Sequence, residues 1–160
     1  TLLVAIVEAV KAEVGSSVPV GIRISQGKVN DFFYTWPGGE KDAQIIFSSL
    51  AEAGADFIHV TEHEAWQPAF ADGQASLVAL ARRYAPSVRL IANGSLHSME
   101  RANGALQDGA DLVALGKGAL SNPDLPQLFE SRSEPRPFDG AILGPIANIK
   151  SSELAFGEAL

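Results

Sequence analysis

Residues 90–118 read LIANGSLHSMERANGALQDGADLVALGKG and contain two places where a short apolar run ends in glycine. The first is LIANGS at residues 90–95, the second is LVALGKG at residues 112–118, and a segment with a helical pattern separates them. Glycine lets a backbone approach a ligand without a Cβ in the way, and the amides that follow can point at phosphate oxygens. Lys117 can add a positive charge. The two junctions therefore predict the phosphate-binding loops of a parallel α/β barrel.

The rest of the chain alternates between helical and extended patterns. Apolar residues recur at spacings of three and four over residues 3–14, which predicts an amphipathic helix that ends at Gly15. Residues 18–25 (VPVGIRIS) are nearly continuously apolar, which is typical of a strand covered by helices on both faces. By the same criteria we expect strands at residues 57–61, 88–92 and 111–115, and helices around residues 43–50, 77–84 and 98–108.

Capping residues predict where two of the later helices begin. Ser98 precedes a helical pattern and is predicted to cap it. Asn122 and Pro123 have the order of an N-cap and a first helical residue, which predicts a final helix through Leu128.

Counting the strands favours half of a barrel. Four strands alternating with helices predict a parallel sheet of βα units, and a complete (β/α)8 barrel needs ~250 residues. Many barrels bind phosphate after strands seven and eight, so the chain is predicted to be the C-terminal half of a TIM barrel. A small doubly wound sheet is the alternative. AGAD at residues 53–56 recurs as DGAD at residues 108–111, and both copies join a helix to a strand.

The domain organisation follows from these patterns. Residues 1–130 are predicted to form four βα units, and residues 131–160 a linker and C-terminal tail of the same domain. A half barrel exposes unpaired strand edges and apolar side chains on its concave face. We therefore expect the chain to form a homo-oligomer or to belong to a longer protein with an N-terminal half. A first residue of Thr1 rather than Met, with a helix already under way, agrees with the second expectation.

Composition narrows the class of protein. With 46% hydrophobic and 19% charged residues, the 160-residue chain suits one globular domain. Twelve basic and 19 acidic residues give a net charge of −7 without a basic cluster, which argues against nucleic acid or an anionic membrane as partner. Cysteine is absent, which excludes disulfides and thiolate metal sites and fits a cytoplasmic location. No apolar stretch has the ~20 residues that span a bilayer.

Three further features are candidates for chemistry. Arg23 lies within an apolar strand, so it should either point into the barrel mouth toward an anionic or electron-rich ligand or pair with an internal carboxylate. Residues 59–63 match the H-x-x-E-H pattern of zinc sites, but a strand would separate the two histidines by ~13 Å, so no metal site is predicted. The aromatic side chains of residues 32–36, with Trp66 and Phe70, are either a pocket wall over a flat cofactor or loop packing.

Taken in order, GIRIS at residues 21–25, FIHVTE at residues 57–62, LIANGSL at residues 90–96 and DLVALGKGALSNPDLPQLF at residues 111–129 resemble the C-terminal half of the Old Yellow Enzyme family. The last segment is the most specific, because a strand ending in glycine and a basic residue is followed by Asn-Pro-Asp-Leu. The resemblance implies an FMN-binding (β/α)8 barrel. It also implies NAD(P)H as reductant, with reduced flavin passing hydride to an activated alkene or similar small-molecule acceptor.

The resemblance also implies roles for individual residues. Arg23 would contact the flavin near N1 and the C2 carbonyl, and Gly94 and Ser95 with Gly116 and Lys117 would hold the FMN phosphate. Lys117 stands where the family usually has arginine, which keeps the charge but loses the bidentate fork. The family's first four strands have no counterpart in this sequence, so no catalytic acid or substrate-polarising residue is assigned. The cofactor-binding set is Arg23, Asn93, Gly94, Ser95, Gly116 and Lys117.

Two other functions are compatible with the patterns. A phosphate-binding half barrel could act on a sugar phosphate as an isomerase or aldolase, but Lys117 is the one strand-end lysine and is already assigned to phosphate. A non-catalytic half barrel that self-associates through its open face is the other alternative.

Overall fold

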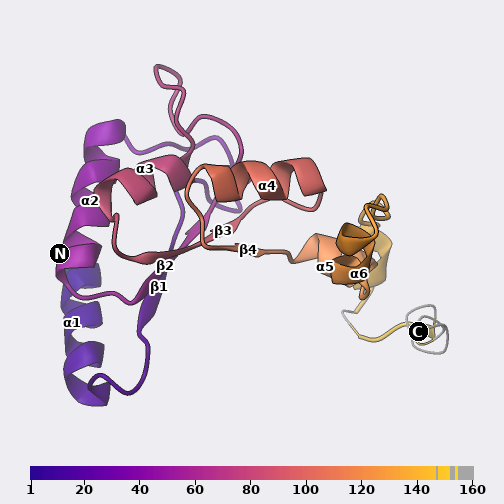
Figure 1. The fold of residues 1–160 in the computed structure, drawn as a ribbon, viewed down its shortest axis with the longest axis horizontal. Helices are drawn as coiled ribbons and strands as arrows, with labels where there is room; N and C mark the ends of the chain where they lie inside the picture. Colours follow the sequence, from indigo (N-terminus) through magenta and orange to yellow (C-terminus); the bar gives the residue numbers. More distant parts are fainter. Residues whose placement is uncertain (147, 152–153, 155–160) are drawn as a thin grey trace.

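A computed structural model describes residues 1–146, 148–151 and 154, and Figure 1 shows four parallel strands alternating with helices. The strands lie side by side in the order β1-β2-β3-β4, and all three pairings are parallel. This confirms the predicted α/β class built from parallel βα units. The strands are β1 (Gly21–Ile24), β2 (Phe57–Thr61), β3 (Arg89–Asn93) and β4 (Leu112–Ala114). The helices are α1 (Leu2–Val14), α2 (Glu40–Glu52), α3 (Leu77–Tyr84), α4 (Met99–Gln107), α5 (Lys117–Ser121) and α6 (Leu125–Glu130), followed by the 3-10 helix η1 (Gly140–Leu143).

The strand order separates a barrel from a doubly wound sheet. A doubly wound sheet reverses its strand order at a switch point, whereas the order here follows the sequence without reversal. Ile58, Val60 and Leu90 are fully buried, while the alternate residues His59 and Ile91 on the same strands are partly exposed. One face of the sheet therefore carries the core, as in part of a barrel wall.

The extended segment at residues 18–25 differs from its prediction in two ways. Regular pairing begins only at Gly21, because the backbone N–H and C=O of Val20 are both bonded to Asp56. The expectation of helices on both faces is wrong, because Ile24 is buried whereas Arg23 is exposed. The apolar run reflects one strongly buried face and glycine at the strand start.

The repeated tetrapeptide has a clear structural role at the helix-to-strand junctions. Gly54 and Gly109 adopt φ values of 81° and 107°, which end α2 and α4 in the left-handed region. The aspartate at the end of each copy then bonds to both the N–H and the C=O of one residue on the preceding strand segment, and this pair of bonds is the aspartate clasp. Asp56 donates its N–H to the carbonyl of Val20 at 2.8 Å, and its Oδ2 accepts the Val20 N–H at 2.7 Å.

Asp111 repeats this arrangement between β3 and β4, whereas Asp56 forms it between β1 and β2. Its N–H donates to the Leu90 carbonyl at 2.8 Å, and its Oδ2 accepts the Leu90 N–H at 2.8 Å. Arg82 and Arg89 pair with the same carboxylate at 2.7 and 2.9 Å. The hydrogen bond from the Leu90 amide, with the two guanidinium groups, holds the pKa of Asp111 below its ordinary value of 3.8 although burial opposes this.

Two helix starts were predicted from capping residues, and one is wrong. Ser98 caps α4 and accepts the Arg101 N–H at 3.3 Å, as predicted. Asn122 does not cap α6, which begins at Leu125 after Asp124. Asn122 is instead fully buried: it donates to the Gly118 carbonyl at 3.0 Å and accepts the Arg136 N–H at 2.9 Å. The side-chain amide of Asn122 therefore links the segment after α6 to α5 through hydrogen bonds.

The C-terminal region lies at the far end of the molecule from α1 (Figure 1). Residues 133–139 have no regular structure, and η1 follows. Residues 147, 152, 153 and 155–160 of the predicted tail lie outside the described residues. Among the described residues, none of the helices combines the length and apolar character needed to cross a membrane.

Apolar side chains are exposed at both ends of the sheet. Leu2 and Ile6 on α1 are 77% and 49% exposed, and Leu112 on β4 is 60% exposed. Within the described residues, β1 and β4 each pair with one neighbouring strand, so each leaves one edge open.

The aspartate clasp gives a testable stability difference. We expect Asp111→Asn to lower the free energy of unfolding at pH 7 by about 1–3 kcal/mol, because a charged acceptor shared by Leu90, Arg82 and Arg89 is lost. The folded-state pKa of Asp111 is depressed, so its contribution is present above the unfolded pKa and is lost as pH falls through the folded value. Urea unfolding at pH 7 and below pH 4 should therefore show the wild type and the variant converging in acid.

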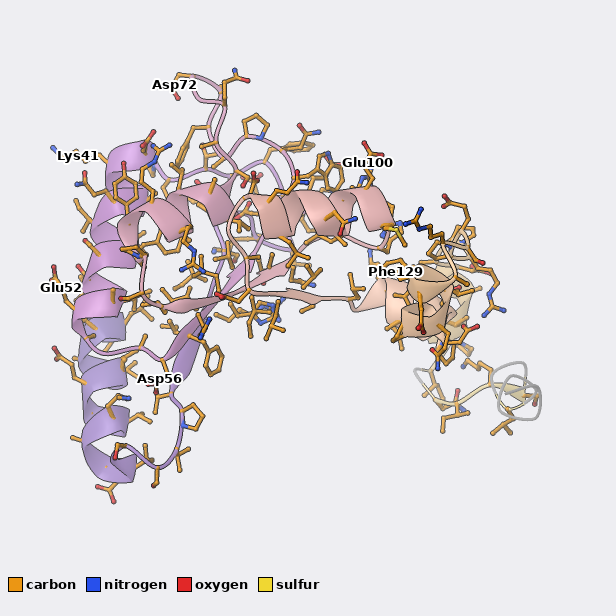
Figure 2. The ribbon with its side chains drawn as sticks, in the orientation of Figure 1. Lys41, Glu52, Asp56, Asp72, Glu100 and Phe129 are labelled. Carbon is orange, nitrogen blue, oxygen red and sulfur yellow. The ribbon has the colours of Figure 1, made fainter. Side chains whose placement is uncertain are left out.

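Asp72→Asn is the matched control, because Asp72 lies on an exposed loop that projects from the body of the molecule (Figure 2). We expect its stability to follow the wild type at both pH values. A wild-type advantage over Asp111→Asn that is unchanged in acid would contradict the clasp.

Candidate functional site

A pocket of about 480 Å³ lies where the four parallel strands end. Its lining comes from the segments that follow each strand, which is where α/β barrels place their sites. All six residues predicted from the sequence line this one pocket: Arg23, Asn93, Gly94, Ser95, Gly116 and Lys117. The structure thus brings the predicted set together, while its contact with a cofactor stays a prediction.

Asn93 joins the two glycine-ended strands. It is the last residue of β3, and its Nδ2 donates to the carbonyl of Ala114 at the end of β4 at 2.8 Å. This bond fixes the ends of both strands at the same level, so the loops after them begin side by side.

Gly94 is required for a reason that its sequence position did not indicate. Its φ is 139°, and a Cβ at this position would lie 2.1 Å from the carbonyl oxygen of Glu62. The Gly94 carbonyl in turn accepts the Ala65 N–H at 3.1 Å. Gly94 therefore allows the loop after β3 to pack against the loop after β2, and close approach to a ligand is not what demands it. By contrast, a Cβ on Gly116 would meet nothing within 4 Å.

Backbone amides from both junctions are available to a ligand. Ser95 has a φ of 52°, and its hydroxyl donates to the carbonyl of His63 at 2.9 Å. Its own amide, together with the amides of Leu96, Lys117 and Gly118, donates to no acceptor in the part of the chain that the structure describes. All four residues line the pocket. Backbone N–H groups without an internal acceptor, on residues that line one cavity, can bind an anion.

Lys117 provides a cation beside these amides. It is the first residue of α5, and its Nζ lies 5.6 Å from the ring centroid of Phe138, which also lines the pocket. A cation and backbone amides without a described acceptor, on residues that follow β3 and β4, are donors of the kind that phosphate groups bind.

Arg23 lies at the opposite edge of the sheet, on β1. It is exposed, and its Nε donates to the Thr61 hydroxyl at 3.0 Å. The alternative of pairing with an internal carboxylate is wrong, because no described carboxylate lies within 4 Å of it. Arg23 thus lines the pocket with no carboxylate partner among the described residues.

His59 lies beside Arg23 in the parallel register. Its Nε2 is buried and has no hydrogen-bond partner among the described residues. Burial, and secondarily the charge of Arg23, lowers the pKa of His59, so the ring is neutral near pH 7. His63, the other histidine of the zinc-like pattern, instead stacks on Phe32 with ring centroids 4.5 Å apart.

The aromatic residues of the predicted wall divide between the pocket, the surface and the core. Phe32 lines the pocket, whereas Phe33 is 91% exposed and Trp36 packs edge-on against Phe47 in the core. Trp66 lies under the guanidinium of Arg101 at 3.7 Å, and Phe70 is buried in the core. The sequence did not separate these roles, because an aromatic side chain serves a core and a ligand wall equally well.

Two residues that hold the site together were missed. Gln26 is fully buried; its Oε1 accepts the Trp36 N–H at 3.0 Å and its Nε2 donates to the Ala69 carbonyl at 3.2 Å. Glu62 accepts the Gln26 N–H at 2.7 Å, and burial raises its pKa although hydrogen bonds from the Gln26 and Gly27 amides oppose this. Both follow a predicted strand almost directly, and that position is the signal that could have identified them.

The Gly94 contact can be tested against a matched glycine. We expect Gly94→Ala to destabilise the fold by at least about 1–3 kcal/mol, because a Cβ would overlap the Glu62 carbonyl at a φ that alanine avoids. Gly104 lies within α4 with nothing near its Cβ position, so Gly104→Ala should instead stabilise by about 0.5–1 kcal/mol. Thermal or urea unfolding measures both, and equal effects in the two variants would refute the close contact.

Solved structures share this architecture. Morphinone reductase in complex with tetrahydroNAD is 26% identical to the chain, with a TM-score of 0.63 over 85% of this chain and 35% of that one. The old yellow enzyme homologue from Zymomonas mobilis is 23% identical, with a TM-score of 0.66 over 85% and 38%. The old yellow enzyme from Trypanosoma cruzi is 22% identical, with a TM-score of 0.65 over 85% and 34%. The last two show the fold alone, and the chain spans little more than a third of these proteins.

The family comparison covers most of the sequence. Residues 1–134 match the model of the NADH:flavin oxidoreductase / NADH oxidase family. The matched region contains all four strands and all six predicted pocket residues. With four parallel strands that superpose on part of an Old Yellow Enzyme barrel, the chain belongs to the NADH:flavin oxidoreductase / NADH oxidase family.

Proposed function

We propose that the pocket binds FMN and that the chain contributes the phosphate-binding part of an NAD(P)H-dependent flavin oxidoreductase. The observation that carries this proposal is that Lys117 and four amides with no acceptor among the described residues line the pocket after β3 and β4, while Arg23 lines it on β1. The cofactor fits the residues present, because the cavity of about 480 Å³ offers phosphate donors and a separate cation in one continuous space. When bound, FMN would supply the redox chemistry, taking electrons from NAD(P)H and reducing an activated alkene or similar acceptor.

The spacing of the cations agrees with a two-ended ligand. Neighbouring strands lie ≈ 4.8 Å apart, so β1 and β4 are separated by about 14 Å. Lys117 and the amides of Ser95 and Leu96 would hold the phosphate at the β3 and β4 end. Arg23 on β1 would donate to the flavin ring, where a fixed positive charge stabilises negative charge that develops on reduction.

His59 supports the electrostatics at the Arg23 end. Because its pKa is lowered, it contributes no second positive charge. Its Nε2, which has no hydrogen-bond partner in the described part of the chain, belongs to a residue on the same sheet face as Arg23. No described residue is assigned as proton donor to the acceptor. A cytoplasmic location stays part of the proposal and rests on the absence of cysteine.

Completion of the barrel is also part of the proposal. The open edges of β1 and β4 and the exposed apolar side chains near them favour pairing with four further strands, supplied by a second copy or by another βα segment. The non-catalytic, self-associating half barrel shares this observation and is the second candidate. The isomerase or aldolase alternative gains no support from the site.

FMN binding by the chain is the first test. We expect titration of FMN, followed by its fluorescence, to show saturable binding that weakens roughly tenfold or more in Lys117→Ala, because a charge-assisted contact with the phosphate is lost. Arg23→Met should weaken reduced FMN more than oxidised FMN, since its charge acts on the anionic ring. Lys41→Ala, on the outer helix α2 (Figure 2), is the control and should bind as the wild type does. Binding that none of these changes affects would refute the assignment of the pocket.

Self-association is a separate test. Light scattering coupled to size-exclusion chromatography at several concentrations should show a species larger than 16.8 kDa that dissociates on dilution. Ile6→Lys, on the exposed apolar side of α1, should shift the sample toward the monomer, whereas Glu8→Lys on the same helix should not. A wild type that stays monomeric at all concentrations would leave completion by another βα segment as the proposal.

A further inference from the structure

The segment that follows α6 contributes a side chain to the pocket. Residues 133–139 have no regular secondary structure, yet Phe138 lines the pocket together with Lys117 and Gly118 of α5. The ring centroid of Phe138 lies 5.6 Å from the Nζ of Lys117, which places the ring at the end of the pocket that follows β4. A segment without regular structure needs other contacts to hold a side chain in such a position.

The side-chain amide of Asn122 supplies these contacts. Asn122 is fully buried, and its Nδ2 donates to the carbonyls of Gly118 and Arg136, at 3.0 Å in both cases. Its Oδ1 accepts the backbone N–H of Arg136 at 2.9 Å and the Arg136 Nε at 3.3 Å. A side-chain amide has two N–H donors and an oxygen with two lone pairs, so all of its hydrogen-bonding capacity is used. A buried polar network that is fully satisfied is rigid.

This network connects two pocket residues over a short length of chain. Lys117 comes directly before Gly118, and Phe138 comes two residues after Arg136. Gly118 is buried, and α5, α6 and the segment after them lie together at one end of the molecule (Figure 1). Asn122 therefore holds Phe138 in a fixed position relative to Lys117.

An aromatic ring in this position restricts the shape of the ligand. Lys117 and the amides near it would hold the phosphate of the flavin, so the ring of Phe138 would lie beside that phosphate. FMN ends at its phosphate. In FAD the same phosphate continues into a second phosphate and an adenosine, which need an open path beyond this end of the pocket. The phenyl ring blocks that path and offers a second phosphate no hydrogen-bond donor, so desolvation of the additional charge is not compensated.

Given the proposed function, we propose that Phe138, held in place by Asn122 through Arg136, makes the pocket selective for a flavin that ends in a monophosphate over one that continues into a dinucleotide. Phe138 is the specificity-determining residue, because its ring closes the phosphate end of the pocket. Asn122 is a positioning residue, because it is fully buried and does not itself line the pocket.

Three flavins that differ only beyond the ribityl chain test this assignment. Isothermal titration calorimetry of the chain with riboflavin, FMN and FAD gives one dissociation constant for each, and we expect the wild type to bind FMN most tightly. Phe138→Ala should lower the ratio of the FAD to the FMN dissociation constant about tenfold, because the block beside the phosphate is removed. The variant should still prefer FMN to riboflavin, since Lys117 and the amides remain.

Matched variants separate the ring from a general change in stability. Phe33→Ala removes a phenylalanine that is 91% exposed and does not line the pocket, so it should keep the wild-type ratio. Phe138→Tyr retains a ring of the same width and should also keep it. Asn122→Ala should lower the FAD-to-FMN ratio as Phe138→Ala does, because the segment loses its contacts with the side-chain amide. An Asn122→Ala chain that binds FMN and FAD more weakly by the same factor would contradict the positioning role.

The two flavin ratios separate this proposal from the proposed function. An FAD-to-FMN ratio that Phe138→Ala leaves unchanged, or a wild type that binds FAD as tightly as FMN, would overturn the role of Phe138 alone. A wild type that binds riboflavin as tightly as FMN, or that binds none of the three flavins, would refute the phosphate site and with it both proposals.

Discussion

Two aspartate clasps fix the geometry on which the site depends. Asp56 and Asp111 each bond to both backbone groups of one residue at the start of the neighbouring strand. A slip of one residue would lose both bonds and turn the buried face of a strand toward the pocket. Since the clasps set the register, the strands end together, and the loops that follow them surround one cavity. The repeated tetrapeptide therefore corresponds to a repeated set of hydrogen bonds between neighbouring strands.

The pocket forms because the four strands end at the same edge of the sheet. Gly94 allows the loop after β3 to pack on the Glu62 carbonyl, and Gln26 and Glu62 join the loops after β1 and β2. Within the described residues, the amides of Ser95 and Leu96, which follow β3, have no internal acceptor. Cations then gather at both ends of the pocket in a chain whose net charge is negative. Local positive potential of this kind attracts anionic ligands regardless of the overall charge.

Most of the fold and part of the pocket lining could be predicted because the signals are local. Helical periodicity, glycine at helix ends and β-branched runs located every helix and strand up to β4 to within a few residues. The failures came where one residue type serves several purposes. Asn122 has the composition of a helix cap but is buried as an anchor for the segment near Arg136. Among the loop aromatics, Phe32 faces the pocket while Trp36 packs on the core, and no local pattern distinguishes them.

The sequence by itself determined the parallel βα order, the two glycine junctions and the identity of six pocket residues, because each depends on neighbours within a few positions. Only the tertiary structure decided why Gly94 must be glycine, which amides are free, and that Phe138 shares a cavity with Lys117. These properties depend on contacts between segments that are separated in the sequence by at least one helix or strand. Their energies arise only when the strands are in register, so no local pattern encodes them.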